Sequence, residues 1–123
     1  MGRYEKVEEL IGLVEKLRID VDEGAVILVE GERDRHALTM LGVAGKVILL
    51  RELRRTIFTQ HINKRVILLL DFDREGEKMT KHIVRELTSQ GINVDLFYYR
   101  KLSAARRLGI NTIEELGRYL RKV

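Results

Sequence analysis

Short apolar runs alternate along the chain with segments in which apolar residues recur every three or four positions. The runs are rich in β-branched residues and are bounded by glycine and acidic residues, which predicts buried strands. The recurring spacing predicts amphipathic helices. The predicted strands span residues 25–29, 46–50, 65–70 and 93–98, and the predicted helices span residues 4–17, 33–41, 51–62 and 76–90.

Strands that are apolar on both faces and alternate with helices predict a parallel sheet covered by helices on each side. We therefore expect an α/β protein with a three-layer α/β/α architecture, a mainly parallel four-stranded central sheet and right-handed crossovers. Residues 1–24 are expected to form an outer helix, residues 25–99 the core and residues 100–123 a basic helical tail, all within a single domain. In the tail, Thr112 and Glu115 have the spacing of a capping box that opens a helix.

The composition narrows the class of protein. The chain has 123 residues, of which 45% are hydrophobic, and this is enough for one core. Its apolar runs are far shorter than the roughly 20 residues needed to cross a bilayer, and its N-terminus lacks a signal-peptide pattern, so we expect a soluble cytoplasmic protein. Cysteine is absent, which excludes disulfides, thiolate metal sites and cysteine nucleophiles.

Acidic residues follow two of the predicted strands, at the point where each strand ends. Glu30 comes directly after the first strand, and Asp71 and Asp73 follow the third. Ligands gather at the carboxyl ends of strands in open α/β sheets, and these carboxylates converge if the two strands are neighbours. Two carboxylates about 4 Å apart repel by roughly 4 kcal/mol at an effective dielectric constant near 20, so such a cluster needs a proton or a cation. Oxygen ligands without cysteine or histidine nearby favour Mg²⁺ or Mn²⁺ over zinc.

A structural interpretation of these acids competes with the metal site. Asp71 and Asp73 could cap the helix that follows the third strand, because acidic residues are common at helix starts. The presence of two acidic strand ends favours the metal site over capping alone. Glu32, Asp34 and Glu77, in contrast, are each expected to be solvated acids in the first turn of a helix.

The net charge of +4 is distributed unevenly. Residues 51–65 carry five bases and one acid, and residues 100–123 carry seven bases and two acids. Such groups either hold a nucleic-acid backbone or form a solvated face, and the one-sided second group favours binding. The candidate phosphate ligands are Arg51, Arg54 and Arg55 in the first group, Arg106 and Arg107 in the second, and Arg33, Arg74 and Lys78 beside the acids. Gly31 and Gly76 would let a phosphate or a backbone segment approach closely.

Two strings in this chain resemble the signature motifs of the toprim domain, which is shared by type IA and type II topoisomerases, bacterial primases, recombination mediators, OLD-family nucleases and small ribosomal RNA maturases. They are VEGERDRHAL at residues 29–38 and LLLDFDREGE at residues 68–77. The first is closer to primases and maturases, and the second to type IA topoisomerases and recombination mediators. The resemblance covers about residues 25–99 and implies a Rossmann-like toprim fold in a small stand-alone toprim protein.

The resemblance also implies roles for the acidic residues. Glu30 matches the toprim glutamate, which has general acid or base and metal-binding duties, Asp71 and Asp73 match the Mg²⁺-binding aspartates, and Glu75 is a further candidate metal ligand. The implied function is Mg²⁺-dependent action on RNA or DNA phosphodiesters, as a nuclease or another processing factor that works as a phosphodiester hydrolase or phosphotransferase. The alternative is a non-catalytic module that binds metal and nucleic acid in a repair or RNA-processing complex, with a protein partner supplying specificity.

Two other classes of protein place acids at strand ends but fit less well. Receiver domains have their acidic pair after the first strand, and phosphatases have their Asp-x-Asp motif there, whereas this chain has Asp-x-Asp after the third. A tyrosine nucleophile of the topoisomerase kind is not expected either. Tyr98 and Tyr99, at the end of the fourth predicted strand, are expected to close the core or to stack.

Overall fold

The computed structural model describes residues 3–53, 55 and 65–121. Its four strands form one parallel sheet in the order β2-β1-β3-β4. The strands are β1 (Val26–Val29), β2 (Val47–Leu49), β3 (Val66–Leu68) and β4 (Val94–Asp95). The two strands followed by acidic residues, β1 and β3, are therefore direct neighbours, which is the condition for their acids to converge.

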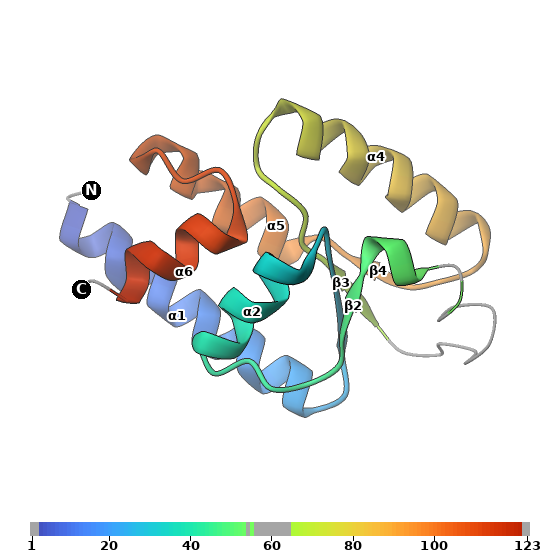
Figure 1. Ribbon diagram of the computed structural model, residues 1–123, viewed down its shortest axis with the longest axis horizontal. Coiled ribbons are helices and arrows are strands. Elements are labelled where there is room, and N and C mark those ends of the chain that lie inside the picture. The colour runs from blue at the N-terminus through green and yellow to red at the C-terminus, as the bar shows by residue number, and fades with distance from the viewer. Residues whose placement is uncertain (1–2, 54, 56–64, 122–123) are drawn as a thin grey trace.

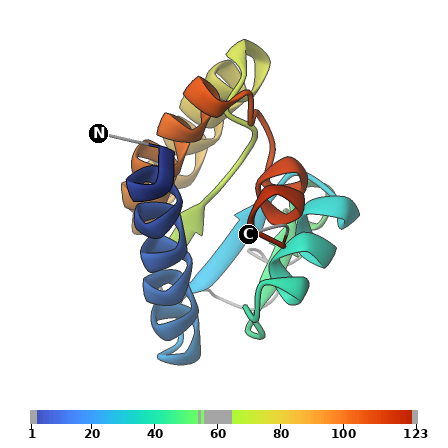
Figure 2. The same cartoon turned by 90° about the vertical axis from the view of Figure 1, so that its left-hand side faces the viewer.

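Helices cover both faces of this sheet, which confirms the predicted three-layer α/β/α architecture (Figure 1). Successive strand side chains point to opposite faces, so Ile27 and Val29 belong to one hydrophobic core and Val26 and Leu28 to another. The first core is closed by α1 (Arg3–Asp22), α2 (Glu32–Met40), α5 (Phe97–Leu102) and α6 (Ile113–Arg121), and the second by α4 (Arg74–Ser89). In Figure 2, α1 lies to the left of the strands, and α2 and α6 lie together to the right.

The fourth strand is shorter than the sequence predicted. The expected strand over residues 93–98 was wrong in its second half, because β4 ends at Asp95 and α5 begins at Phe97. In the turn between them, the Asp95 side chain accepts a hydrogen bond from the Phe97 N–H at 2.8 Å. Periodicity alone does not separate a short buried strand from a short buried helix, and here the aromatic residues pack as a helix.

Tyr98 lies in the core on α5, as expected for a tyrosine that closes the core. Its side chain is 1% exposed, and its hydroxyl donates a hydrogen bond to the carboxylate of Asp20 on α1. Burial and the neighbouring Asp20 carboxylate raise the pKa of Tyr98 above its ordinary value. The hydroxyl therefore stays protonated and buried, which is unsuitable for a nucleophile.

The C-terminal residues pack onto the sheet layers. The short helix η2 (Ser103–Leu108) follows α5 directly, and α6 begins with the predicted cap, in which Thr112 Oγ1 accepts a hydrogen bond from the Glu115 N–H at 3.0 Å. On α6, Gly117 approaches α2 so closely that a Cβ added there would lie 3.2 Å from the Ala37 Cβ. Close packing of α6 on α2 therefore depends on a small residue at this position.

Two remaining features bear on the sequence predictions. The short helix η1 (Leu50–Glu52) lies at the start of the helix expected over residues 51–62, most of which falls outside the described residues. None of the described helices combines the length and the apolar character needed to span a bilayer.

Candidate functional site

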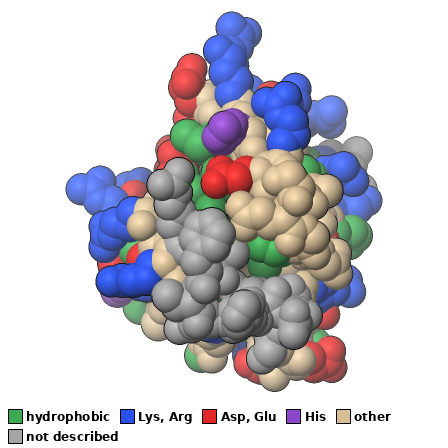
Figure 3. All heavy atoms as spheres, turned by 90° about the vertical axis from the view of Figure 1, so that its right-hand side faces the viewer, with side chains coloured by type: hydrophobic (Ala, Val, Ile, Leu, Met, Phe, Trp, Pro, Cys, Tyr) green, Lys and Arg blue, Asp and Glu red, His purple; other side chains and the backbone are tan. Residues whose placement is uncertain are grey.

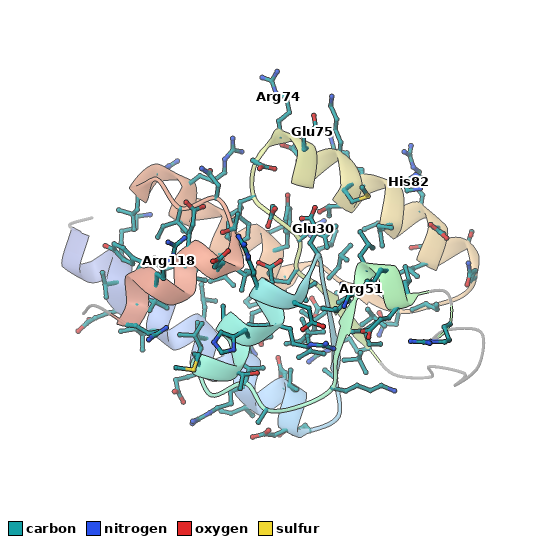
Figure 4. The ribbon with its side chains drawn as sticks, viewed as in Figure 1. Glu30, Arg51, Arg74, Glu75, His82 and Arg118 are labelled. Atoms are coloured by element: carbon teal, nitrogen blue, oxygen red, sulfur yellow. The ribbon has the colours of Figure 1, made fainter. Side chains whose placement is uncertain are left out.

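Glu30 and Asp71 form the centre of the candidate site. Glu30 directly follows β1, and Asp71 lies in the loop after β3. A backbone hydrogen bond from the Leu69 N–H to the Leu28 carbonyl, at 2.9 Å, holds the two strand ends in register. The Asp71 and Glu30 side chains are close enough to share a hydrogen bond. Figure 4 shows Glu30 at the end of β1, where α2 begins.

The position of the Asp71 carboxyl group, buried and beside Glu30, changes its ionisation. Burial, together with the hydrogen bond and the charge of Glu30, raises the pKa of Asp71 to about 7. The charges of Asp34 and Asp73 add further repulsion. Near neutral pH the pair therefore favours either a shared proton or a bound cation over two negative charges.

Asp73 has a structural task that the sequence left open. It is the N-cap of α4, where its Oδ1 accepts a hydrogen bond from the Gly76 N–H at 2.8 Å. The capping interpretation therefore describes Asp73, whereas the Asp71 carboxyl faces Glu30. Across residues 3–53, 55 and 65–121, no group of three or more His, Asp or Glu side chains is gathered to hold a metal ion. Of the four candidate metal ligands, the structure thus brings Glu30 and Asp71 into contact, and it places Asp73 near enough for its charge to act on Asp71.

Gly76 positions the Asp71 backbone. It is buried in the first turn of α4, and a Cβ added there would lie 2.0 Å from the Asp71 carbonyl oxygen and 2.9 Å from the Asp71 Cβ. Real Cβ atoms do not approach other atoms so closely, so only glycine lets α4 pack against this loop. The backbone approach anticipated for Gly76 is therefore made by the protein itself.

Gly31 presents the opposite case. Its backbone is extended, with φ −154°, and no other part of the described chain lies within 4 Å of a Cβ added there, outside its two neighbours. The space beside Gly31 is thus open at the end of β1. The backbone conformation does not require glycine at this position. The absence of a side chain instead leaves space in which a ligand could lie.

Asp34 is a buried member of the site that the sequence analysis missed. We expected a solvated acid, but its side chain is buried and accepts hydrogen bonds from the Gly31 N–H, at 3.3 Å, and from the backbone N–H of Glu114. Burial, assisted by the charges of Glu30 and Glu114, raises the pKa of Asp34. The spacing from Gly31 to Asp34 could have indicated that Asp34 caps α2. The contact with residue 114 could not be predicted, because it joins segments far apart in the sequence.

The segment formed by residues 111–114, which runs from the loop after η2 into the first turn of α6, contacts both acidic strand ends. The Phe72 N–H donates to the Asn111 carbonyl at 2.7 Å, while the Glu114 N–H donates to the Asp34 carboxylate. Phe72 lies between the two aspartates of the β3–α4 loop, and Asp34 lies four residues after Glu30. One short segment therefore holds the backbone of the β3–α4 loop on one side of the carboxyl pair and the Asp34 side chain on the other.

Glu75 does not join this pair. Its side chain is 87% exposed and lies 3.9 Å from the Lys78 ammonium group. Figure 4 shows Arg74 and Glu75 at the outer end of α4, away from Glu30. The structure therefore gives Glu75 a surface position rather than a place beside Glu30 and Asp71.

The candidate phosphate ligands fall on several surfaces. Arg51 makes an ion pair with Glu32 at 3.1 Å, and this places its exposed guanidinium group beside the start of α2. Arg54 lies outside the described residues. Figure 3 shows Lys and Arg side chains gathered over α4 at the top of that face. The other candidates all have exposed side chains, and they are Arg33, Arg55, Arg74, Lys78, Arg106 and Arg107.

The donor set suits a hard cation. Glu30 and Asp71 supply carboxylate oxygens and Asp73 adds negative charge, while cysteine is absent from the chain. Mg²⁺ often binds through one or two carboxylates and keeps several waters, so a contacting pair fits such an ion without a third protein ligand. A divalent cation would also offset the repulsion that, together with burial, raises the pKa of Asp71.

Comparisons with known proteins identify the family. Residues 24–98 match the model of the toprim domain, and the chain belongs to the toprim family. It is 35% identical to a UPF0292 protein of Methanocaldococcus jannaschii over 126 residues, which cover 99% of this chain and 98% of that protein. A UPF0292 protein of Thermococcus kodakarensis is 36% identical over 122 residues, which cover 97% of this chain and 90% of that protein.

A solved structure has a similar fold. A protein from Aquifex aeolicus is 31% identical and matches with a TM-score of 0.69, covering 85% of this chain and 94% of that chain. The family predicted from the two motifs and the predicted fold class are both confirmed. The toprim domain connects this chain with metal-dependent functions that involve nucleic acids.

Proposed function

We propose that this protein acts on phosphodiesters of RNA or DNA with Mg²⁺ or Mn²⁺ as its cofactor. The observation that carries the proposal is the contact between the Glu30 and Asp71 carboxyl groups at the common edge of β1 and β3. Glu30 and Asp71 would hold the ion, with Asp73 contributing its charge. When bound, the ion would neutralise charge that develops on a phosphate oxygen.

Glu30 is suited to proton transfer in this reaction. Its side chain is exposed, so it can reach a water molecule or a substrate oxygen while remaining beside Asp71. In hydrolysis, water attacks phosphorus, the bond from phosphorus to the leaving oxygen breaks, and Glu30 takes the proton from the water or gives one to the leaving oxygen. The open space beside Gly31 lets a phosphate approach this carboxylate.

The test is cleavage of structured RNAs and of single- and double-stranded DNAs, with Mg²⁺ and with EDTA. Glu30→Gln should lower turnover by about 10² to 10⁴, because it removes the proton transfer while keeping the shape of the side chain. Glu32→Gln is the matched control, since Glu32 lies two residues further along the chain, at the start of α2, and pairs with Arg35 and Arg51. Its turnover should stay close to that of the wild type.

Failure of this test has a defined meaning. If the wild-type protein binds nucleic acid but cleaves none of these substrates in Mg²⁺ or Mn²⁺, the catalytic proposal is wrong and the non-catalytic binding module replaces it. A protein partner that supplies specificity stays a prediction, and it would appear as a change in which nucleic acids the protein binds or cleaves when the partner is present.

A further inference from the structure

A cavity of about 420 Å³ lies between α4 and the segment formed by α5 and η2. Phe72, the residue between Asp71 and Asp73, lines it, and so does Tyr99 on α5. The cavity therefore adjoins the loop that carries the two aspartates. Its volume is within the range of pockets that hold small organic ligands.

Tyr99 offers an aromatic surface in this cavity. Its ring is half-buried and packs against Phe72, with ring centroids 5.9 Å apart and the planes tilted by 50°. Its hydroxyl donates to the Asp71 carbonyl oxygen at 3.4 Å. The ring is thus attached to the loop of the candidate site, and aromatic rings of this kind stack with any nucleobase.

The charge of the lining complements a phosphate. Lys81, Arg100 and Arg106 line the cavity together with one acid, Glu77, which lies 3.7 Å from the Lys81 ammonium group. Within the part of the chain that the structure describes, Arg100 and Arg106 make no ion pair. Two arginines near a partly exposed aromatic ring are therefore available to a ligand that combines a flat apolar group with negative charge.

We propose that this cavity binds a nucleoside monophosphate unit, with its base stacked on Tyr99 and its phosphate held by Arg100 and Arg106. The inference rests on the proposed function, because the unit would be an unpaired nucleotide of the strand that reaches Glu30 and Asp71. A base inside a duplex has both faces covered by its neighbours and cannot stack on Tyr99. The cavity therefore selects nucleic acids that have an unpaired nucleotide near the site.

The experiment measures binding in EDTA, so that it does not depend on cleavage. Oligonucleotides that contain 2-aminopurine in a single-stranded overhang report stacking by quenching of their fluorescence. Wild-type protein should quench this signal and bind the overhang at least tenfold more tightly than a blunt duplex. Tyr99→Leu should abolish the quenching and weaken binding by about tenfold, in keeping with the roughly 1–3 kcal/mol of one base–aromatic stack. Tyr99→Phe should retain both.

Arg106 and Arg107 supply a matched pair of charge variants. Both are exposed on η2, but only Arg106 lines the cavity. Arg106→Ala should weaken overhang binding severalfold, while Arg107→Ala, which removes the same charge, should change it by less than twofold. The surface position of both residues keeps this comparison valid even if Tyr99→Leu fails to fold.

Three results would overturn the proposal: equal binding of overhang and blunt duplex, equal losses in the two arginine variants, or unchanged quenching in folded Tyr99→Leu. Competition by adenosine monophosphate separates free nucleotides from strands as the source of the unit. If adenosine monophosphate competes with an affinity equal to that of the oligonucleotide, the cavity binds free nucleotides. If it competes much more weakly, the cavity binds nucleotides within a strand. The readout is binding in EDTA and involves no cleavage, so a failure of catalysis leaves this result unaffected.

Discussion

The acidic ends of β1 and β3 have a similar arrangement of residues but differ in how tightly those residues are packed. Each directs one carboxyl group toward the other strand, Glu30 from β1 and Asp71 from β3. Each also has a second aspartate that accepts a backbone N–H three residues away, at 3.3 Å from Gly31 to Asp34 and at 2.8 Å from Gly76 to Asp73. In the first the glycine precedes the aspartate, and in the second it follows.

The glycines show what this difference means. Gly31 borders open space, whereas Gly76 packs against the Asp71 backbone. The β1 end therefore provides access, and the β3 end provides a fixed position for its carboxyl group. A site that admits a phosphate and also holds a cation needs both an open strand end and a strand end with a fixed carboxyl group.

The largest difference in stability should appear when a methyl group is added to each of the two glycines in turn. Gly76→Ala should destabilise the protein by about 1–3 kcal/mol, because its Cβ would overlap the Asp71 carbonyl and the α4 helix must shift. Gly31→Ala should cost less than about 1 kcal/mol, which is the usual difference between these residues at an N-cap. Urea unfolding of the two variants measures this contrast, and equal losses would show that both strand ends are equally packed.

A smaller effect concerns pH. In the folded protein the pKa of Asp71 is raised from its ordinary value of 3.8 to about 7, so the folded state binds this proton more tightly than the unfolded chain. The resulting stabilisation is complete below about pH 4 and is lost as the pH rises toward 7. After allowance for solvent screening of a half-exposed group, the loss should be about 1–2 kcal/mol.

The matching variant is Asp71→Asn, which cannot titrate. Unfolding in EDTA at pH 5 and pH 8 should show a smaller loss of stability in this variant than in the wild type. Asp34, whose pKa is also raised by burial, keeps its own share of the pH dependence in both proteins. An identical pH dependence in the two proteins would mean that folding does not raise the pKa of Asp71.

The smallest effect is expected at Glu75. Glu75→Gln should leave Mg²⁺ affinity within about twofold of the wild type, because the side chain is almost fully exposed on the outer end of α4. Asp71→Asn should weaken the affinity sharply. Isothermal titration calorimetry compares the two, and a sharp loss in Glu75→Gln would return this residue to the set of metal ligands.

The sequence was sufficient for those features that depend on local pattern. Alternating apolar runs and helical spacing predicted the three layers, and acids placed after two runs predicted the edge where Glu30 and Asp71 meet. Local pattern was insufficient at β4, since Val94 to Tyr99 suits either a strand or a buried helix. It also could not show that Asp34 is buried, because the Glu114 N–H that binds it lies 80 residues away.

The segment that joins the two strand ends uses main-chain atoms. The Asn111 carbonyl accepts from the Phe72 N–H, and the Glu114 N–H donates to the Asp34 carboxylate. Every residue type supplies a carbonyl, and every type except proline supplies an N–H, so substitutions at positions 111 and 114 preserve these bonds. Residues 111–114 also lie beyond the part of the chain that matches the toprim model. Mutations can therefore accumulate at positions 111 and 114 while the two halves of the site stay joined, and among relatives these two positions should diverge faster than the geometry that their main chain maintains.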